Sequence, residues 1–293
     1  MSSFWLPPRR RSCQLRSSAR ASVMESDMTS VSGIDATLPG IARVYDYWLG
    51  GKDNFEVDRE EAERLAKINP KLPDIACSNR RWIIRVVRYA VRSGVRQILD
   101  VGCGLPTSSV QFPNVHETAQ EEAVDTRVVY VDNDPMVQTH GRALLATNEC
   151  TSLQVGDLRD LNAFLESMRS WGLDLSQPVL LLLAAVLHFF PDRGEPHPKR
   201  IVGEIMGRLP PGSFLAISHG EDTGDLREVA KNYTAASTQL RNQQQVLELF
   251  SGLELVGPGV VQLHKWHPDE DRTSLNYSVP VLGGLARKPS CHA

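Results

Sequence analysis

Carboxylates stand at the ends of three apolar runs, where each run gives way to a turn. Asp100 precedes the glycine pair Gly102 and Gly104, Asp132 ends the run RVVYVDN, and Asp157 ends SLQVGD. In an open α/β sheet, ligands bind beyond the carboxyl ends of the strands. A carboxylate such as Asp132 accepts both hydroxyl protons of a ribose, and one placed like Asp157 accepts from the exocyclic amine of a base. This spacing predicts a site for a nucleoside-like ligand.

The glycine loop ILDVGCGLPTSS, residues 98–109, differs from a phosphate-binding loop at one point. Pro106 stands where a third glycine would come. A pyrophosphate needs free N–H donors at the start of a helix, and proline removes one donor and stiffens the turn. The loop therefore suits a ligand that has no pyrophosphate.

Five apolar runs alternate with helix-like segments after residue 95 and must position these groups. The runs are RQILDVG, RVVYVDN, SLQVGDL, PVLLLLAAVL and GSFLAISHG, and the segments between them span 115–124, 135–146, 161–171 and 198–209. Such alternation predicts a parallel sheet with helices on both faces.

The order changes after the fifth run. Two helix-like stretches, 222–231 and 235–250, precede two strand-like runs at 253–263 and 276–288. No crossover helix separates these last two runs, so they must pair antiparallel. We expect a seven-stranded, mostly parallel, Rossmann-like α/β sheet that ends in an antiparallel hairpin.

The pattern predicts a helical cap over residues 31–93 and a main domain over residues 94–289. We expect the cap and the main domain to form one unit. A short aromatic helix (41–50), an amphipathic helix (57–68) and a longer helix from the N-cap Asp74 to Arg92 fit the pattern. Residues 1–30 contain arginines among serines without a following apolar run, which rules against an export signal. We expect a disordered tail, or a true start at Met24 or Met28.

Charge and hydropathy exclude two classes of partner. The 293 residues include 32 basic and 35 acidic side chains, a formal net charge of −3, which gives no reason to expect nucleic acid or a membrane surface. The longest apolar run, 179–187, is too short to span a bilayer.

Cysteine and histidine spacing argues against a metal centre. The five cysteines contain no C-x-x-C pair and indicate free thiols in a reducing, cytoplasmic environment. His264 and His267 have no cysteine or acid partner at metal-ligand spacing. We therefore predict no metal.

These features together resemble class I S-adenosylmethionine-dependent methyltransferases, and more narrowly the S-adenosyl methyltransferase family abundant in actinobacteria, long described as a domain of unknown function. The matching stretches cover about residues 34–289: ARVYDYWLGGKDNFEVDRE, NRRWIIRVVRYA, ILDVGCGLPT, NVHETAQ, RVVYVDNDP, GDLRD, LLLAAVLHFFPD, GSFLAISH and GLARKP. The resemblance implies S-adenosylmethionine as cofactor and leaves the methyl acceptor open; we expect a small molecule.

The expected cofactor site combines the loop and strand-end residues: Asp100, Gly102, Gly104, Asp132, Asn133, Asp157 and Leu158. Arg80, next to Asn79, is either part of a solvated arginine face or close to the cofactor carboxylate.

The cap supplies a second group of candidates. Tyr45, Tyr47, Trp48, Lys52 and Asn54 lie in the dense stretch RVYDYWLGGKDNF. They predict a lid or acceptor-side wall that excludes water. The alternative is that the aromatic rings pack a helix on the sheet, while the two glycines only end it.

Two histidines are candidates for a general base, which is needed only if the acceptor must lose a proton. His188 follows the fourth run, and His116 follows the glycine loop. The alternative for His188 is a half-buried histidine bonded to backbone.

Two other functions remain open at this stage. The first is a regulator that binds S-adenosylmethionine or S-adenosylhomocysteine without turnover. The second, a nicotinamide-dependent oxidoreductase, is disfavoured by Pro106, by the antiparallel end, and by the 30 residues from Gly102 to Asp132, where about 20 are usual.

Overall fold

The computed structural model describes residues 33–107, 111–146, 148–267 and 279–290. The chain divides into two compact units, 1–35 and 36–293, and the fold below is that of the second unit. The tail predicted for residues 1–30 lies outside the described residues.

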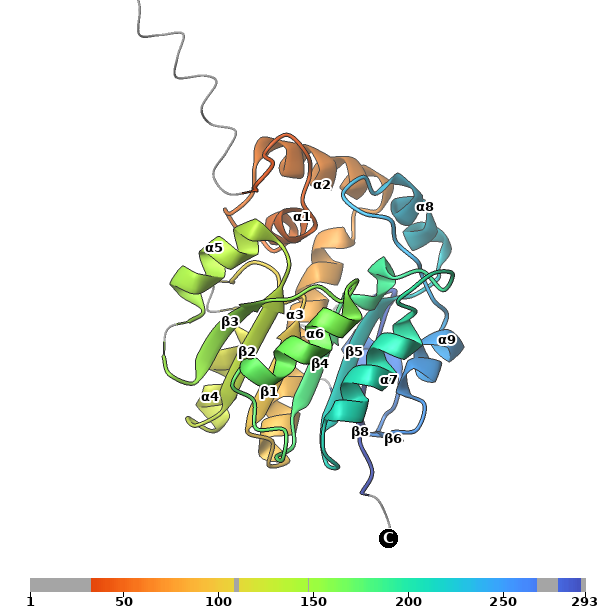
Figure 1. The fold of residues 1–293 in the computed structure, drawn as a ribbon. Coiled ribbons are helices and arrows are strands. Elements are labelled where there is room, and N and C mark those ends of the chain that lie inside the picture. Colours follow the sequence, from red (N-terminus) through yellow and green to blue (C-terminus); the bar gives the residue numbers. More distant parts are fainter. Residues whose placement is uncertain (1–32, 108–110, 147, 268–278, 291–293) are drawn as a thin grey trace, which may run out of the picture. The chain divides into compact units, whose positions relative to one another are not determined.

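A mixed sheet forms the centre of this unit (Figure 1). Its order is β3 (Thr151–Val155), β2 (Arg127–Asp132), β1 (Gln97–Val101), β4 (Leu180–Ala184), β5 (Phe214–Gly220), β8 (Val281–Arg287) and β6 (Glu254–Leu255), with β7 (Val261–Gln262) also paired to β8. The first five strands are parallel, and β8 runs antiparallel to β5, β6 and β7. The predicted fold class is confirmed.

The strand count differs from the prediction. The described residues form eight strands, because the single run expected at 253–263 is split into β6 and β7. Pro258 and the left-handed Gly259 (φ +88°) lie between the two halves. A proline has no N–H for a ladder, so the run is interrupted there.

Alternate side chains of the central strands enter opposite cores. Ile98 and Leu180 pack with α3 (Leu72–Arg92) and α4 (Val115–Glu122). Leu99 and Leu181 pack with α6 (Leu161–Ser167) and α7 (Pro198–Arg208). In Figure 1, α6 and α7 lie in front of the sheet, with α3 and α4 behind it. Burial of both faces explains why these runs are almost continuously apolar.

The strand order reverses between β1 and β4, which creates a crevice beyond their carboxyl ends. The cap helices α1 (Ile41–Trp48) and α2 (Glu56–Ile68) lie at this end of the sheet, together with α8 (Gly224–Asn232) and α5 (Pro135–Leu144) (Figure 1). The topology thus directs the carboxylates of β1 and β2 toward the cap.

The turn after α1 is held by Asp46. Its carboxylate accepts hydrogen bonds from the Asp53 N–H at 3.0 Å and from Asn54 Nδ2 at 2.8 Å. A Cβ on Gly51 would lie 1.9 Å from an oxygen of Asp46, so only glycine fits there. The GGKDN stretch is therefore built as a tight polar turn.

Two predicted helix boundaries were wrong. The helix expected at 235–250 is reduced to α9 (Gln243–Leu247) and a 3-10 turn at 248–250, because Asn242 caps α9 by accepting from the Gln245 N–H. Helix α3 begins at Leu72, with Pro73 in its first turn, so Asp74 lies inside the helix and is not its N-cap.

No helix in the described ranges has both the length and the apolar character to cross a bilayer.

Candidate functional site

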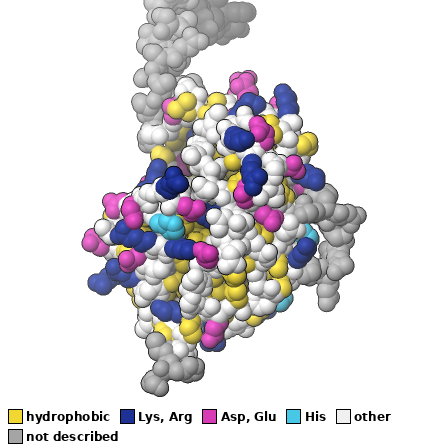
Figure 2. Space-filling model, turned by 90° about the vertical axis from the view of Figure 1, so that its right-hand side faces the viewer, with side chains coloured by type: hydrophobic (Ala, Val, Ile, Leu, Met, Phe, Trp, Pro, Cys, Tyr) yellow, Lys and Arg dark blue, Asp and Glu magenta, His cyan; other side chains and the backbone are white. Residues whose placement is uncertain are grey.

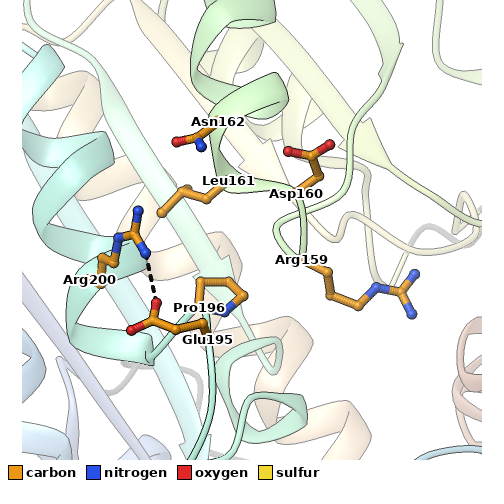
Figure 3. Close-up of a pocket in the computed structure, with 7 residues that line it drawn as sticks. All are labelled: Arg159, Asp160, Leu161, Asn162, Glu195, Pro196 and Arg200. Atoms are coloured by element: carbon orange, nitrogen blue, oxygen red, sulfur yellow. Dashed lines mark hydrogen bonds and ion pairs between the residues drawn. The ribbon is translucent and has the colours of Figure 1, made fainter.

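A cavity of about 770 Å³ lies between the cap, the carboxyl ends of the central strands, and α8 with the loop after it. A second hollow, of about 190 Å³, is lined by Arg159, Asp160, Leu161, Asn162, Glu195, Pro196 and Arg200 (Figure 3). Both arginines of the small hollow are already paired, one with Asp157 at 2.5 Å and one with Glu195 at 2.8 Å. The large cavity is therefore the candidate site.

The glycine loop after β1 requires glycine at two positions. Gly102 and Gly104 have φ angles of +69° and +68°, in the left-handed region that L side chains rarely adopt. A Cβ on Gly102 would also lie 2.5 Å from Val186 Cγ2, whereas a Cβ on Gly104 would meet open space. Both glycines line the cavity.

The backbone donors of this loop point to β2. The N–H groups of Gly102 and Cys103 donate to the Val131 carbonyl at 2.8 and 3.3 Å, and the Gly104 N–H donates to Asp132 Oδ2 at 2.9 Å. These three N–H groups are thus already used within the protein. They are therefore not free to bind a phosphate, which agrees with the expectation drawn from Pro106.

Asp132 lines the cavity at the end of β2 and is 9% exposed. One of its oxygens accepts from Gly104, and the other accepts from the Asp134 N–H at 3.0 Å. Burial raises the pKa of Asp132, and these N–H donors oppose the increase. A carboxylate has about four lone-pair positions, so two remain for ligand hydroxyls.

Asp157 lines the same cavity at the end of β3, together with Asn133 and Leu158. It accepts hydrogen bonds from Asn133 Nδ2 at 3.0 Å and from the Arg159 side chain at 2.5–2.9 Å. Partial burial alone would raise the pKa of Asp157, but the Arg159 and Asn133 hydrogen bonds outweigh it and lower the pKa to about 2. The group is a charged acceptor at neutral pH.

Asp100 and Arg80 form the inner end of the cavity. Asp100 is 5% exposed, and its pKa is raised to about 7 by burial, with Arg80 opposing and Asp132 adding to the increase. Arg80 is 7% exposed; one terminal nitrogen donates to the Leu105 carbonyl at 3.4 Å, while its buried Nε has no hydrogen-bond partner among the described residues. An unpaired guanidinium donor in a cavity suits a carboxylate ligand.

The two predicted histidines differ in their placement. His188 lies in a 3-10 turn, Leu187–Phe189, and lines the cavity. Burial, with His219 and Arg241 nearby, lowers the pKa of His188 to about 3, so its ring is neutral at physiological pH. Its Nδ1 has no hydrogen-bond partner within the described parts of the chain.

His116 is not brought to the cavity. It is buried in the first turn of α4, where its N–H and its ring Nδ1 lie 2.8 and 3.0 Å from the Tyr130 hydroxyl. The structure thus gives this histidine a partner in the core and no cavity-facing position.

Of the five cap residues predicted as a lid, Tyr45 and Trp48 line the cavity. Tyr47 lies at the surface, where its hydroxyl donates to Glu63 at 2.8 Å, and Asn54 is bonded to Asp46. Lys52 is exposed and is not among the lining residues. Tyr45 and Trp48 are three positions apart and share one face of α1, from which Tyr47 is turned away.

Several lining residues were not predicted. They come from the 3-10 turn Leu187–Phe189 and the residue after it, from α8 and from the loop after α8: Phe189, Phe190, Leu226, Val229, Tyr233, Ala235, Ala236, Thr238 and Leu240. These are apolar or small side chains scattered over 52 positions, from 189 to 240. No spacing in such a set points to one site.

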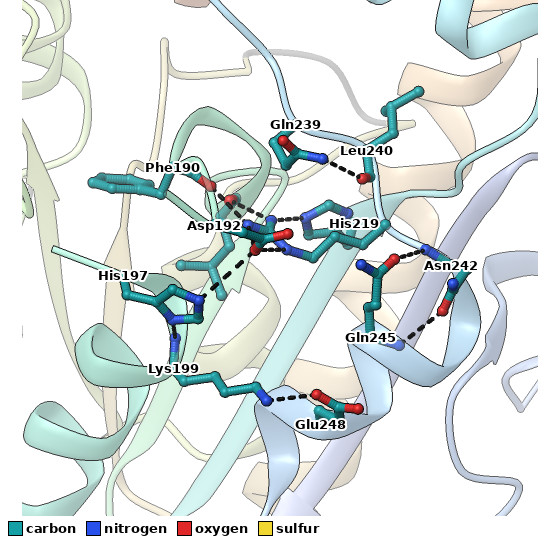
Figure 4. Close-up of polar contacts among 12 residues, drawn as sticks. Phe190, Asp192, His197, Lys199, His219, Gln239, Leu240, Asn242, Gln245 and Glu248 are labelled. Carbon is teal, nitrogen blue, oxygen red and sulfur yellow. Dashed lines mark hydrogen bonds and ion pairs between the residues drawn. The ribbon is translucent and has the colours of Figure 1, made fainter. Parts of the chain in front are cut away.

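Arg241 joins these segments and was also not predicted. It is 2% exposed, with bonds to the Leu187 and Phe190 carbonyls, to Asp192 Oδ1 at 2.7 Å and to His219 Nε2 at 2.7 Å. Figure 4 labels three of these partners, Phe190, Asp192 and His219. Because arginine only donates, Nε2 of His219 is the acceptor and its Nδ1 donates to the Gly220 carbonyl. This buried network holds together the segments that carry the lining residues Phe190, Gly220 and Leu240.

Comparisons with known proteins found a family model and solved structures that are similar to this chain. Residues 27–289 match the model of a family described as S-adenosyl methyltransferase. A DUF574 family protein from Streptomyces avermitilis is 38% identical over 87% of this chain and 99% of its own, with a TM-score of 0.80. A candidate methyltransferase from Thermobifida fusca is 39% identical over 88% of this chain and 98% of its own, also at 0.80. No curated protein matches.

Proposed function

Because this chain belongs to the S-adenosyl methyltransferase family, with S-adenosylmethionine as its cofactor, we propose that the large cavity binds that cofactor at the strand ends and a small-molecule acceptor beneath the cap. The observation that carries the proposal is the glycine loop, whose N–H donors serve β2 while the Asp132 carboxylate lines the cavity. Such a loop suits a nucleoside that has no pyrophosphate.

In this proposal, each strand-end side chain binds a different part of the cofactor. Asp132 accepts from the ribose hydroxyls, and Asp157 accepts from the exocyclic amine, beside Asn133 and Leu158. Arg80 binds the amino-acid carboxylate through its unpaired donor, and Asp100 pairs with the amino group. When bound, S-adenosylmethionine supplies a methyl group already activated on a sulfonium.

The protein's contribution to transfer is then mainly proximity and alignment of the two reactants. Tyr45 and Trp48 exclude water from the side of the cap, and His188 offers a neutral ring next to the acceptor. His188 is thus proposed as an acceptor-contacting group.

The partner and location proposals rest on charge and thiol chemistry. Acidic and basic side chains are interspersed on the face drawn in Figure 2, without a basic stripe suited to nucleic acid. Cys77, Cys103 and Cys150 are free thiols, which supports a reducing, cytoplasmic location.

Thermal or chemical unfolding with added ligand tests the cofactor assignment. At 100 times the dissociation constant, S-adenosylmethionine or S-adenosylhomocysteine should add about 2.7 kcal/mol of stability, and NAD should add nothing. Stabilisation by NAD alone would contradict the proposal. Incubation with labelled S-adenosylmethionine and cell extract then separates an enzyme from a binding protein, because only an enzyme yields a labelled product.

A further inference from the structure

The half of the cavity remote from Asp132 and Asp157 is walled by apolar groups; we call it the acceptor half. Its walls come from α1, α3, α8 and the loop after α8: Tyr45, Trp48, Leu72, Ile75, Leu226, Val229, Tyr233, Ala235, Ala236, Thr238 and Leu240. Several of them belong to one hydrophobic cluster between the cap and α8. The charged lining residues, such as Asp100, Asp132 and Asp157, all lie in the other half, at the strand ends or beside them.

The buried charged side chains of α1 and α2 are already engaged with partners. Arg43 pairs with the fully buried Asp58 at 2.8 Å, and Asp46 is bonded to the turn after α1. Glu61 accepts from Arg64 at 2.7 Å. A charged ligand in the acceptor half would therefore lose its hydration without gaining a counter-ion, which costs several kcal/mol.

Two lining side chains with unused hydrogen-bonding capacity come from segments that are bonded to each other. His188 Nδ1 and Thr238 Oγ1 are buried and have no hydrogen-bond partner among the described residues. The two segments are held together, because the Gln239 N–H donates to the His188 carbonyl at 2.7 Å. Tyr45, in contrast, has its hydroxyl occupied by Asn79 Nδ2 at 3.0 Å and by a backbone carbonyl at 3.1 Å. Unpaired buried polar atoms indicate a missing partner.

We propose that the methyl acceptor is an uncharged, mainly apolar hydroxyl compound that lies against α1, α3 and α8 and places its hydroxyl at His188 and Thr238. The inference rests on the proposed function, since it concerns the same cavity. An alkyl amine is cationic at neutral pH, and a carboxylate is anionic. Neither charge has a partner in the acceptor half.

The transfer step balances with these groups. The hydroxyl oxygen forms a bond to the methyl carbon, while the methyl–sulfur bond breaks and leaves its electron pair on sulfur. As the oxygen–carbon bond forms, the hydroxyl becomes strongly acidic, and its proton passes to the neutral His188 ring and from there to water. Because the pKa of His188 is lowered to about 3, the ring returns that proton readily.

Three probes that share a naphthalene ring test the charge preference on protein saturated with S-adenosylhomocysteine: 2-naphthol, 2-naphthoate and 2-naphthylmethylammonium. We expect naphthol to bind at least about tenfold more tightly than either ion, measured by calorimetry. Equal or tighter binding of an ion, or no naphthol binding up to its solubility limit, would overturn the inference. Saturation with S-adenosylhomocysteine is measured first, so its failure would contradict the proposed function separately.

An introduced charge provides a reversal test. Ala236→Arg places a cation in the acceptor half, and Ala143→Arg, at an exposed position of α5, is the matched control. We expect only the first variant to gain naphthoate affinity, by about tenfold, with binding of S-adenosylhomocysteine retained in both. The same gain in both variants, or in neither, would argue that the probes bind elsewhere.

The hydroxyl position is tested by comparing 2-naphthol with naphthalene. The wild-type protein should prefer naphthol by up to about tenfold, the contribution of one hydrogen bond. His188→Phe should remove that preference while leaving naphthalene binding intact. A preference that survives this substitution would show that His188 does not contact the hydroxyl.

Discussion

The two halves of the cavity are built by different means. The half of the cavity at the strand ends is the one that we propose for the cofactor, and we call it the cofactor half. Its carboxylates Asp100, Asp132 and Asp157 stand at the ends of neighbouring parallel strands, so the sheet itself places them. In the acceptor half, the walls come from the cap and from α8, and the buried Arg241 fastens the loop between them. In our proposal, the sheet thus binds the general cofactor, and segments that can vary without disturbing the sheet bind the acceptor.

The largest expected loss of stability comes from replacing Arg241, which joins segments of the acceptor half. Arg241→Gln breaks the partly exposed pair with Asp192 and leaves buried acceptors at Leu187, Phe190 and His219 without their donor, so it should lower the free energy of unfolding by ~2–4 kcal/mol, measured in urea. The control Arg227→Gln removes an exposed pair with Asp222 and should change little. Similar losses in the two variants would contradict a special role for Arg241.

Asp132 tests the cofactor half. Asp132→Asn removes the charge that accepts from Gly104 and, in our proposal, from the ribose, so affinity for S-adenosylhomocysteine should fall about 10- to 150-fold, or ~1.5–3 kcal/mol. Calorimetry measures the affinity for S-adenosylhomocysteine in each variant. Asp160→Asn is the matched control, because Asp160 only caps α6 and asparagine is an equally good cap. Unchanged affinity in Asp132→Asn would place the ribose elsewhere.

The glycine loop offers a comparison within one half. Gly102→Ala and Gly104→Ala share the strain of a positive φ, ~1–2 kcal/mol, but only the first meets Val186. Gly102→Ala should therefore be the less stable variant by a further ~1–3 kcal/mol in urea unfolding. Equal stabilities would mean that Val186 moves aside without cost.

The smallest expected effect is a pH dependence from Asp100. Its pKa of about 7 lies above the ordinary value, so the free folded protein keeps a proton that the unfolded chain has released between about pH 4 and 7, and stability falls as pH rises through that window. A ligand ammonium favours the ionised form. Affinity for S-adenosylmethionine should therefore rise with pH by up to about tenfold per unit below pH 7.

Calorimetry from pH 5.5 to 7.5 measures this dependence. The variant Asp100→Asn cannot ionise and should show a flat profile across that range. A profile in the variant that is as steep as the wild-type one would assign the titration to another group.

The sequence was sufficient for most of the sheet and for the edge that carries the cofactor half. Strands buried on both faces, such as β1 and β4, appear in the sequence as nearly continuous apolar runs. Because these strands are parallel, the residues at their carboxyl ends must meet at one edge of the sheet. The prediction that Asp132 and Asp157 share a cavity follows from this rule alone.

What the sequence could not show depends on long-range contacts. The segment 235–240 looks helical by composition, yet its backbone is bonded to the His188 carbonyl and it lies against the cavity. Arg241 is one arginine in a polar stretch, and only the fold reveals that it is buried. Tyr47 and Trp48 are adjacent in sequence, and only the packing of α1 separates their roles.

The cap also bears on the order in which the chain folds. Glu61 of α2 accepts from the Thr234 N–H, 173 residues later, and Arg85 of α3 donates to the Trp266 carbonyl, 181 residues later. During synthesis the cap therefore leaves the ribosome first but gains these partners near the end. A fragment of residues 31–93 would expose Trp82 and Leu65, so it should not fold independently. The cap therefore reaches its final contacts late, at the stage when the last strand of the sheet, β8, also pairs.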